Sequence, residues 1–120
     1  MNCAEAISRA DTYKKNTIDE SLKLQWLQEL EMTIYVEILS THVGELPPLP
    51  KCDITDTKEL FAPTPYDVIY PRYIVMRMDD LLQENEKYNN SAQLFNEAYR
   101  SFSAYYTRTH LPKSHGDWRL

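Results

Sequence analysis

Three carboxylates close together are the first residues of this sequence that could carry chemistry. Asp79, Asp80 and Glu84 fall on one predicted helix, and paired carboxylates can bind a divalent cation or act as general acid and base. Arg77 and Lys87 stand at helical spacing from them, and no histidine lies nearby. We therefore interpret the cluster as a solvated charged face, and we keep an enzyme or metal protein built on these carboxylates as an alternative.

The histidines do not complete a catalytic constellation. His42 and His110 fall at predicted helix C-termini, where a partly protonated imidazole interacts favourably with the helix dipole, and His115 lies in a polar tail. No serine or cysteine has a histidine and a carboxylate at a recognisable family spacing, although such groups can also converge only in space. We expect no catalytic residues and a protein that is not an enzyme.

Two cysteines are the remaining candidates for metal or redox chemistry. Cys3 and Cys52 stand far apart and lack the Cys-x-x-Cys spacing of a zinc site. We interpret them as reduced thiols of an intracellular protein, and we expect neither a metal nor a cofactor.

The elements that position these residues are predicted to be helices. Apolar residues recur at helical spacing in four stretches: residues 2–15, 17–42, 64–87 and 90–110. In the last stretch, Phe95, Tyr99 and Phe102 form the centre of a broad apolar face, and we expect the chain to be organised around it. Asn90 is its predicted N-cap, and Pro112 ends it.

The other helix boundaries follow from capping signals. Asn2 and Thr17 each precede a glutamate by three residues, the spacing of a capping box. Thr64 is predicted to cap the third helix, which Pro71 should kink or divide because proline removes a backbone hydrogen bond. Residues 88–90 are predicted to form the tight turn of an antiparallel hairpin between the third and fourth helices.

Proline interrupts the helical pattern in residues 43–64. We expect an extended loop there, with a possible short strand over residues 54–60. The match of residues 47–50 to a Pro-x-x-Pro ligand motif is explained by an extended linker. Residues 111–120 are predicted to be an irregular tail. The fold class is therefore all-α: one domain over residues 1–120, a small bundle of about four helices with a long proline-rich loop.

Composition limits the function further. With 120 residues, 42% of them hydrophobic, the chain can bury a core, and two glycines leave little room for a phosphate-binding loop. The net charge of −5 disfavours generic nucleic-acid binding, which requires lysine and arginine to neutralise phosphates. The sequence shows neither the basic and apolar regions of a signal peptide nor an apolar run of transmembrane length, so we expect no membrane association.

One family resemblance goes beyond these constraints and spans residues 17–113, about four fifths of the chain. The blocks that carry it are Gln25-Trp26-Leu27, Glu29-Leu30, Tyr35, Thr41-His42, Asp56-Thr57, Glu59-Leu60, Pro63-Thr64-Pro65-Tyr66-Asp67, Tyr88-Asn89-Asn90-Ser91, Phe95-Asn96, Tyr99, Phe102, Tyr105-Tyr106 and Arg108-Thr109-His110-Leu111-Pro112-Lys113. In these blocks the chain resembles head–tail connector, or adaptor, proteins of tailed phages and prophages of Gram-positive bacteria.

The resemblance implies a structural role without an active site. Connector proteins form a ring, typically of twelve copies, that docks on the portal protein, extends the DNA channel and receives a tail-side stopper protein. The resemblance also implies that the protein is located at the head–tail junction of the virion, and in the host cytoplasm during assembly. DNA would pass without sequence-specific binding, a role compatible with an acidic chain. The alternative is a small regulatory or adaptor protein that binds a host or phage protein.

Two segments are the candidate interfaces for this role. Prolines pre-extend the 43–64 loop and reduce the entropy lost on docking, so we expect it to pack against a neighbouring subunit. In the tail, a tryptophan near the terminus is a candidate anchor for the portal. The candidate interface residues are Leu46, Pro47, Pro48, Leu49, Pro50, Trp118 and Arg119.

Overall fold

The computed structural model describes residues 1–111 and contains four α-helices and two short 3₁₀ helices in that part of the chain. In chain order they are α1 (Cys3–Tyr13), α2 (Glu20–Glu37), η1 (Leu39–Thr41), η2 (Tyr66–Val68), α3 (Ile69–Leu81) and α4 (Asn85–Thr109). The described residues include no β-strand, so the possible strand over residues 54–60 does not form. The prediction of a small all-α domain of four helices is confirmed.

The first helix begins at the predicted capping box, whereas the second has no side-chain hydrogen bond at its N-cap. Asn2 accepts a hydrogen bond from the Glu5 N–H and Glu5 accepts one from the Asn2 N–H, the predicted capping box. Helix α2 starts later than predicted, with Asp19 rather than Thr17 at the N-cap. The preceding turn is held by Asn16, which accepts from the Ile18 N–H (3.0 Å).

Proline does not kink the third helix, contrary to our prediction. Helix α3 begins at Ile69, after η2, so Pro71 is only its third residue. The N–H groups of a first helical turn have no partner within the helix, and a proline there removes no hydrogen bond. Thr64 does not cap this helix either; its hydroxyl donates to the Asp67 carboxylate (2.9 Å).

The turn between α3 and α4 lies earlier than predicted. Gln83 adopts a φ of 56°, the left-handed conformation that commonly ends a helix, and α4 begins at Asn85. Asn90 is therefore inside α4 and does not cap it. No glycine or proline interrupts residues 85–90, so the helix continues through the expected turn.

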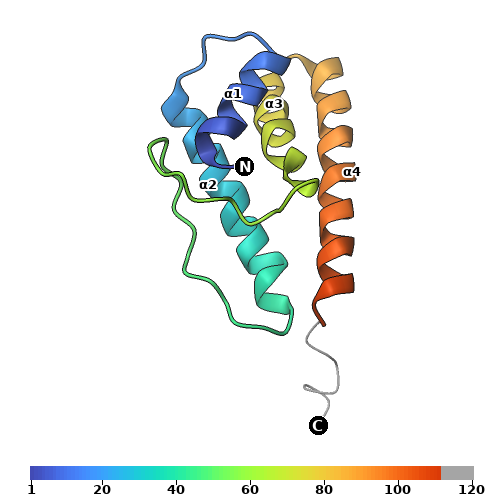
Figure 1. The fold of residues 1–120 in the computed structure, drawn as a ribbon. Helices are drawn as coiled ribbons and strands as arrows, with labels where there is room; N and C mark the ends of the chain where they lie inside the picture. Colours follow the sequence, from blue (N-terminus) through green and yellow to red (C-terminus); the bar gives the residue numbers. More distant parts are fainter. Residues whose placement is uncertain (112–120) are drawn as a thin grey trace.

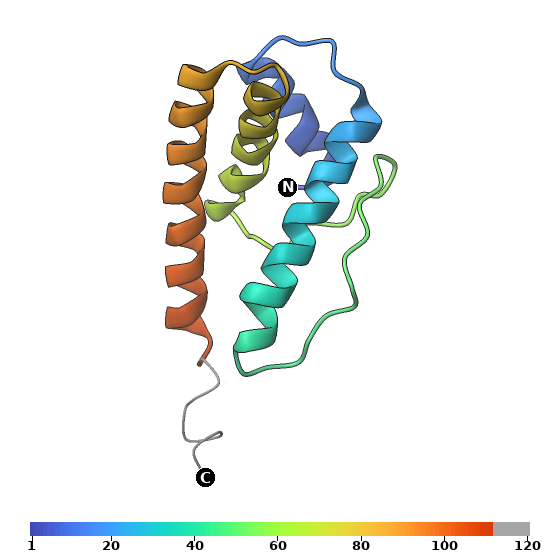
Figure 2. The ribbon, with the colours of Figure 1, turned by 180° about the vertical axis from the view of Figure 1, so that it is seen from behind.

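Helix α3, rather than α4, is the centre of the fold. Its backbone approaches those of α1, α2 and α4, whereas the backbone of α4 approaches only α3 and η2 closely. Figures 1 and 2 show α3 lying between α4 on one side and α1 and α2 on the other. The expectation that the chain is organised around its last helix is therefore wrong, although the apolar face of that helix forms: Phe95, Ala98 and Phe102 are buried.

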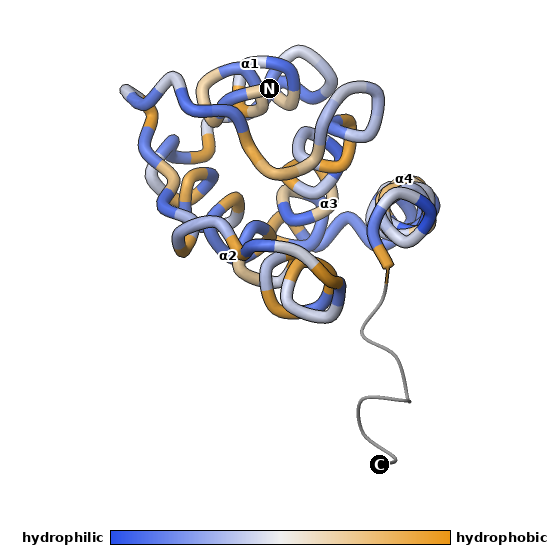
Figure 3. The backbone as a smooth tube through the Cα atoms, turned by 60° about the horizontal axis from the view of Figure 1, so that its bottom comes forward, coloured by the Kyte–Doolittle hydropathy of each residue, from blue (hydrophilic) through white to orange (hydrophobic). Residues whose placement is uncertain are grey.

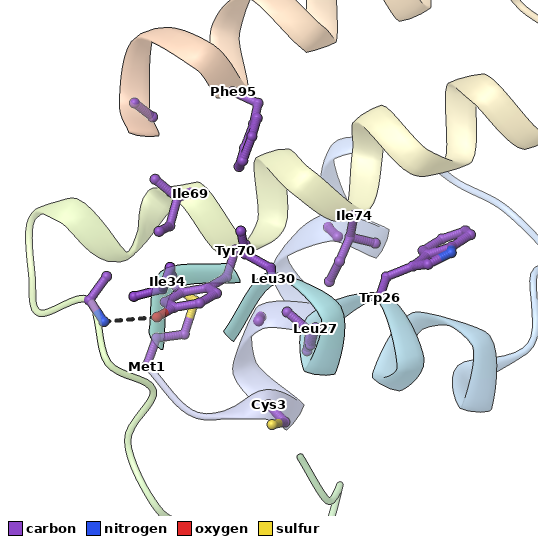
Figure 4. Close-up of a cluster of buried hydrophobic side chains, with 14 of the residues drawn as sticks. Met1, Cys3, Trp26, Leu27, Leu30, Ile34, Ile69, Tyr70, Ile74 and Phe95 are labelled. Atoms are coloured by element: carbon purple, nitrogen blue, oxygen red, sulfur yellow. Dashed lines mark hydrogen bonds between the residues drawn. The ribbon is translucent and has the colours of Figure 1, made fainter. Parts of the chain in front are cut away.

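The core consists of aliphatic and aromatic side chains from all four helices. Ile34, Ile69, Ile74 and Phe102 are inaccessible to solvent, and each such side chain contributes roughly 1.5–3 kcal/mol relative to an exposed one. Figure 4 shows this cluster where α2 and α3 face each other. Figure 3 shows short apolar stretches alternating with polar ones along the helices, the pattern that amphipathic helices require.

Residues 43–64 connect η1 to η2 without a helix or strand. Figure 1 shows this 43–64 segment returning along α2 before it crosses to the start of α3. None of the helices in the described range combines the length and apolar character that crossing a bilayer requires.

Candidate functional site

The 43–64 segment exposes apolar side chains near its beginning. Leu46 is 44% and Leu49 66% exposed, and Val43 is similarly accessible. We call these three residues the apolar loop surface. An exposed leucine alone needs no explanation, but several along one short segment are typical of a protein–protein contact.

The backbone beneath this surface is fixed to α2 by hydrogen bonds. The Tyr35 hydroxyl donates to the Pro47 carbonyl (3.0 Å), and the Gln28 side-chain amide donates to the Pro50 carbonyl (2.8 Å). The same amide accepts from the Cys52 N–H (2.8 Å). The apolar loop surface is therefore presented by an ordered segment, which lowers the entropy that a partner must offset on binding.

The predicted interface residues divide between this surface and the tail. Pro47 and Pro50 are half-buried against the domain, and Pro48 is exposed with the leucines on either side. The anchor prediction for Trp118 and Arg119 lies outside the described residues.

The carboxylate cluster is not the solvated face that the sequence predicted. Asp79 is only 3% exposed, whereas Asp80 is exposed and Glu84 is partly so. The Lys14 ammonium, at the end of α1, donates to both Asp79 and Glu84. The Ser91 hydroxyl donates to the other oxygen of Asp79 (2.7 Å). The cluster thus joins α1 to the hairpin of α3 and α4.

Charge pairing determines the ionisation of this cluster. Burial disfavours the ammonium of Lys14, but its hydrogen bonds to Asp79 and Glu84 outweigh burial and raise its pKa. The bond from Lys14 is also the main reason that the pKa of Glu84 is lowered. Both carboxylates are therefore paired with a cation of the chain itself, the Lys14 ammonium. Within residues 1–111, no group of three histidine, cysteine or acidic side chains is arranged to hold a metal ion.

A second buried carboxylate was not singled out from the sequence. Glu31 of α2 is 2% exposed and accepts from the Tyr70 hydroxyl (2.6 Å) and from the Phe61 N–H (3.0 Å). The Tyr70 hydroxyl accepts in turn from the Ala62 N–H (2.8 Å), the bond drawn in Figure 4. This network fastens the end of the 43–64 segment to α2 and α3.

No cation forms a salt bridge with Glu31 in the described structure. Burial raises its pKa to about 7, and the hydrogen bonds from Tyr70 and Phe61 oppose this shift only in part. Glu31 therefore changes its protonation near neutral pH while it remains enclosed by the core.

The fold also brings the two cysteines together. Cys3 and Cys52 line one hollow of about 20 Å³, together with Glu31 and Phe61. The pKa of Cys3 is lowered, mainly by the Cys52 thiol. Burial acts in the opposite direction, and the backbone of Asp53 lowers the pKa further. The Cys3 thiol and burial raise the pKa of Cys52. The prediction of free thiols agrees with the structure, but their proximity was not foreseen.

The histidines of the described chain serve the helix ends. His42 is buried; its Nδ1 lies 2.6 Å from the Ile38 carbonyl oxygen and its Nε2 lies 3.1 Å from the Thr107 hydroxyl. His110 is the C-cap of α4 and stacks on Tyr106 with ring centroids 3.9 Å apart. Both positions agree with the predicted capping roles, and His115 lies outside the described residues.

Comparison of the chain with protein families, with curated proteins and with solved structures finds no match.

Sequence reasoning missed the buried polar groups because they come from distant segments. One signal was available: Glu31 follows Leu27 by four residues and precedes Ile34 by three, so its spacing places it on the buried face of α2. The positions of Cys3 and Cys52 in the sequence did not indicate that the two side chains come together.

Proposed function

We propose that this protein is a structural assembly subunit, and specifically a subunit of a phage head–tail connector ring that docks on the portal protein. The assignment to a head–tail connector rests on the sequence blocks between residues 17 and 113 that resemble those proteins. Its place of action would be the head–tail junction, where the ring extends the DNA channel and receives the stopper protein.

The observation that carries the assembly role is the apolar loop surface on its ordered backbone. Leu46 and Leu49 are exposed on a segment that Tyr35 and Gln28 fix to α2. A preformed apolar surface of this kind suits repeated contact between identical subunits, because little further ordering opposes docking. We propose that it contacts the neighbouring subunit of the ring. Trp118 and Arg119 remain the proposed anchor on the portal.

Charge supports passage of DNA rather than binding to it. The net charge of −5 provides no excess of lysine and arginine to hold phosphates. A ring of such subunits would let DNA slide through its channel. On this proposal the protein has no catalytic residue, and the groups buried in its interior serve the fold.

The test combines the purified protein with the portal protein and measures particle mass by light scattering. We expect a high-order complex for the wild type, and we expect Leu46→Asp/Leu49→Asp to abolish it while helicity by circular dichroism is unchanged. Leu81→Asp/Leu82→Asp is the matched control, since these leucines are also exposed but lie at the turn between α3 and α4.

One outcome would contradict the connector role and another the role of the apolar loop surface. One is a wild-type protein that does not respond to the portal and forms a stable one-to-one complex with another protein, as a regulatory adaptor would. The other is equal loss of assembly in the two double variants, which would remove the role of the apolar loop surface.

A further inference from the structure

The two cysteines lie at a position that the proposed assembly role does not require. They are separated by most of the first half of the chain, yet both line the hollow beside Glu31. Figure 4 shows Cys3 at the start of α1, at the edge of the core cluster. Two thiols that lie close together can join covalently where their backbones are held at the separation that a disulfide spans.

Both backbones are held. Cys3 is the first residue of α1, whose start is fixed by the capping box of Asn2 and Glu5. The Cys52 N–H donates to the Gln28 side chain (2.8 Å), and the Leu60 N–H donates to the Met1 carbonyl (2.9 Å). The 43–64 segment is thus attached to α2 and to the N-terminus on both sides of the hollow.

The surroundings give the two sulfurs different roles. The nearby Cys52 thiol is the main cause that the pKa of Cys3 is lowered. The Cys3 thiol and burial raise the pKa of Cys52. The thiolate is the reactive form of cysteine, so Cys3 is the nucleophile and Cys52 is the thiol that resolves the product.

We propose that Cys3 and Cys52 form a peroxide-sensitive thiol pair, which closes reversibly into a disulfide between α1 and the 43–64 segment. The oxidant is hydrogen peroxide. The Cys3 thiolate attacks one peroxide oxygen, the S–O bond forms, the O–O bond breaks, and the departing hydroxide takes up a proton as water. Cys3 is then a sulfenic acid.

The second step closes the disulfide. The Cys52 sulfur attacks the Cys3 sulfur, the S–S bond forms, and the S–O bond breaks. The hydroxyl group leaves with the Cys52 proton as water. In total, two thiols lose two electrons and two protons, and one peroxide becomes two waters. A dithiol reductant reverses the closure by thiol–disulfide exchange.

The size of the hollow selects the oxidant. A volume of about 20 Å³ holds one molecule of the size of water. Cys3 is buried and Cys52 is half-buried, so we expect a small peroxide to reach the pair much faster than a bulky disulfide such as oxidised glutathione. The disulfide would hold the 43–64 segment, and with it the apolar loop surface, in a fixed position relative to α1. This inference stands independently of the proposed function.

The test treats the reduced full-length protein with one equivalent of hydrogen peroxide. We expect both thiols to disappear, the mass to fall by that of two hydrogen atoms, and a peptide linking Cys3 to Cys52 to appear. The midpoint of thermal unfolding should rise by about 10 °C and return after dithiothreitol. Oxidised glutathione should give the same product at a rate at least about tenfold lower than that of peroxide.

A single variant tests the role of Cys3. Cys52→Ser should leave a sulfenic acid on Cys3 that dimedone traps, because the serine hydroxyl can still donate to the Cys3 sulfur. Circular dichroism confirms that the variant is folded. The proposal is overturned if the wild type retains both thiols, if the disulfides join two copies of the chain, or if Cys52→Ser forms no sulfenic acid on Cys3.

Discussion

In the part of the chain that the structure describes, the two most enclosed carboxylates have opposite partners. Glu31 on α2 and Asp79 on α3 are almost equally inaccessible, at 2% and 3% exposed. Asp79 contacts the Lys14 ammonium, whereas Glu31 receives only a hydroxyl and a backbone N–H. Equal burial therefore does not give equal electrostatics.

The comparison shows that hydrogen bonds from neutral donors do not offset the effect of burial on Glu31, and that of the two only Asp79 has a charged partner among the described residues. Hydrogen bonds from Tyr70 and Phe61 do not prevent burial from raising the pKa of Glu31 to about 7. The ammonium that joins Asp79 to Glu84 makes the other site an ion pair. Buried charges are retained when an opposite charge compensates for lost solvation. The free energy of unfolding should therefore fall when the ion pair of Asp79 is broken, and it should depend on pH through Glu31.

The largest effect is expected at the ion pair. Asp79→Ala leaves Lys14 mostly buried with only the partly exposed Glu84, and removes one of the three acceptors of the Ser91 hydroxyl. Breaking a buried pair from one side costs about 4 kcal/mol. Urea unfolding at pH 7, followed by circular dichroism, measures this loss in the free energy of unfolding.

The neighbouring Asp80 provides the control for Asp79, because it is exposed on the same helix. Asp80→Ala should change the free energy of unfolding by no more than about 0.5 kcal/mol. Similar losses at the two positions would mean that the enclosure of Asp79 has no energetic consequence.

The second largest effect is the pH dependence caused by Glu31. In the unfolded chain this carboxyl ionises near its ordinary value of 4.5, but in the folded chain only near 7. Between these values the folded state holds a proton that the unfolded state has released, so stability falls as pH rises. The loss between pH 4.5 and pH 7.5 is about 3 kcal/mol from this residue.

Glu31→Gln isolates that contribution, because an amide does not ionise. The pH slope of the free energy of unfolding should become flatter between pH 5 and pH 7.5 in the variant. Groups with a lowered pKa, such as Asp11 and Glu84, change stability at lower pH, as pH falls through their folded-state values. Identical slopes for variant and wild type would show that Glu31 is ionised throughout this range.

The helices were predictable from the sequence and their arrangement was not. Periodicity identified the apolar face of α4 through Phe95 and Phe102, because it reports which side of a helix must be covered. It does not report which helix covers it, so the central position of α3 was missed. Pro71 was misjudged because its effect depends on where the helix begins.

The contacts of the buried polar side chains were even less predictable from the sequence than the arrangement of the helices. Asp79 was treated as solvated because Arg77 and Lys87 stand near it in sequence, but its cation is Lys14 from another helix. The Glu31 and Cys3–Cys52 contacts also join distant segments. Such contacts depend on tertiary packing, which local spacing does not encode.

A smaller effect is expected for the hydroxyl beside Glu31. Tyr70→Phe removes a donor to Glu31 and leaves the buried Ala62 N–H without its acceptor, at a cost of about 2 kcal/mol. The pKa of Glu31 should rise further, because a bond that favours its charged form is lost. Tyr99→Phe is the control: its hydroxyl also donates to a glutamate of α2, Glu37, but at an exposed position. Equal losses in both variants would contradict the role of burial.

The smallest effect is expected at Glu29, which lies two residues before Glu31 and has the charged partner that Glu31 lacks. Its carboxylate pairs with Arg77 at 2.7 Å, but both side chains are about one-third or more exposed. Water and salt screen such a pair, so Glu29→Gln should cost about 0.5 kcal/mol, and about 1 M sodium chloride should remove most of the difference. Arg77 keeps its position over the Trp26 and Tyr73 rings in the variant, which limits the loss to the charge interaction. Unfolding in urea at low and high salt measures both quantities. A loss as large as that of Asp79→Ala would show that pairing alone, without enclosure, sets the strength of these contacts.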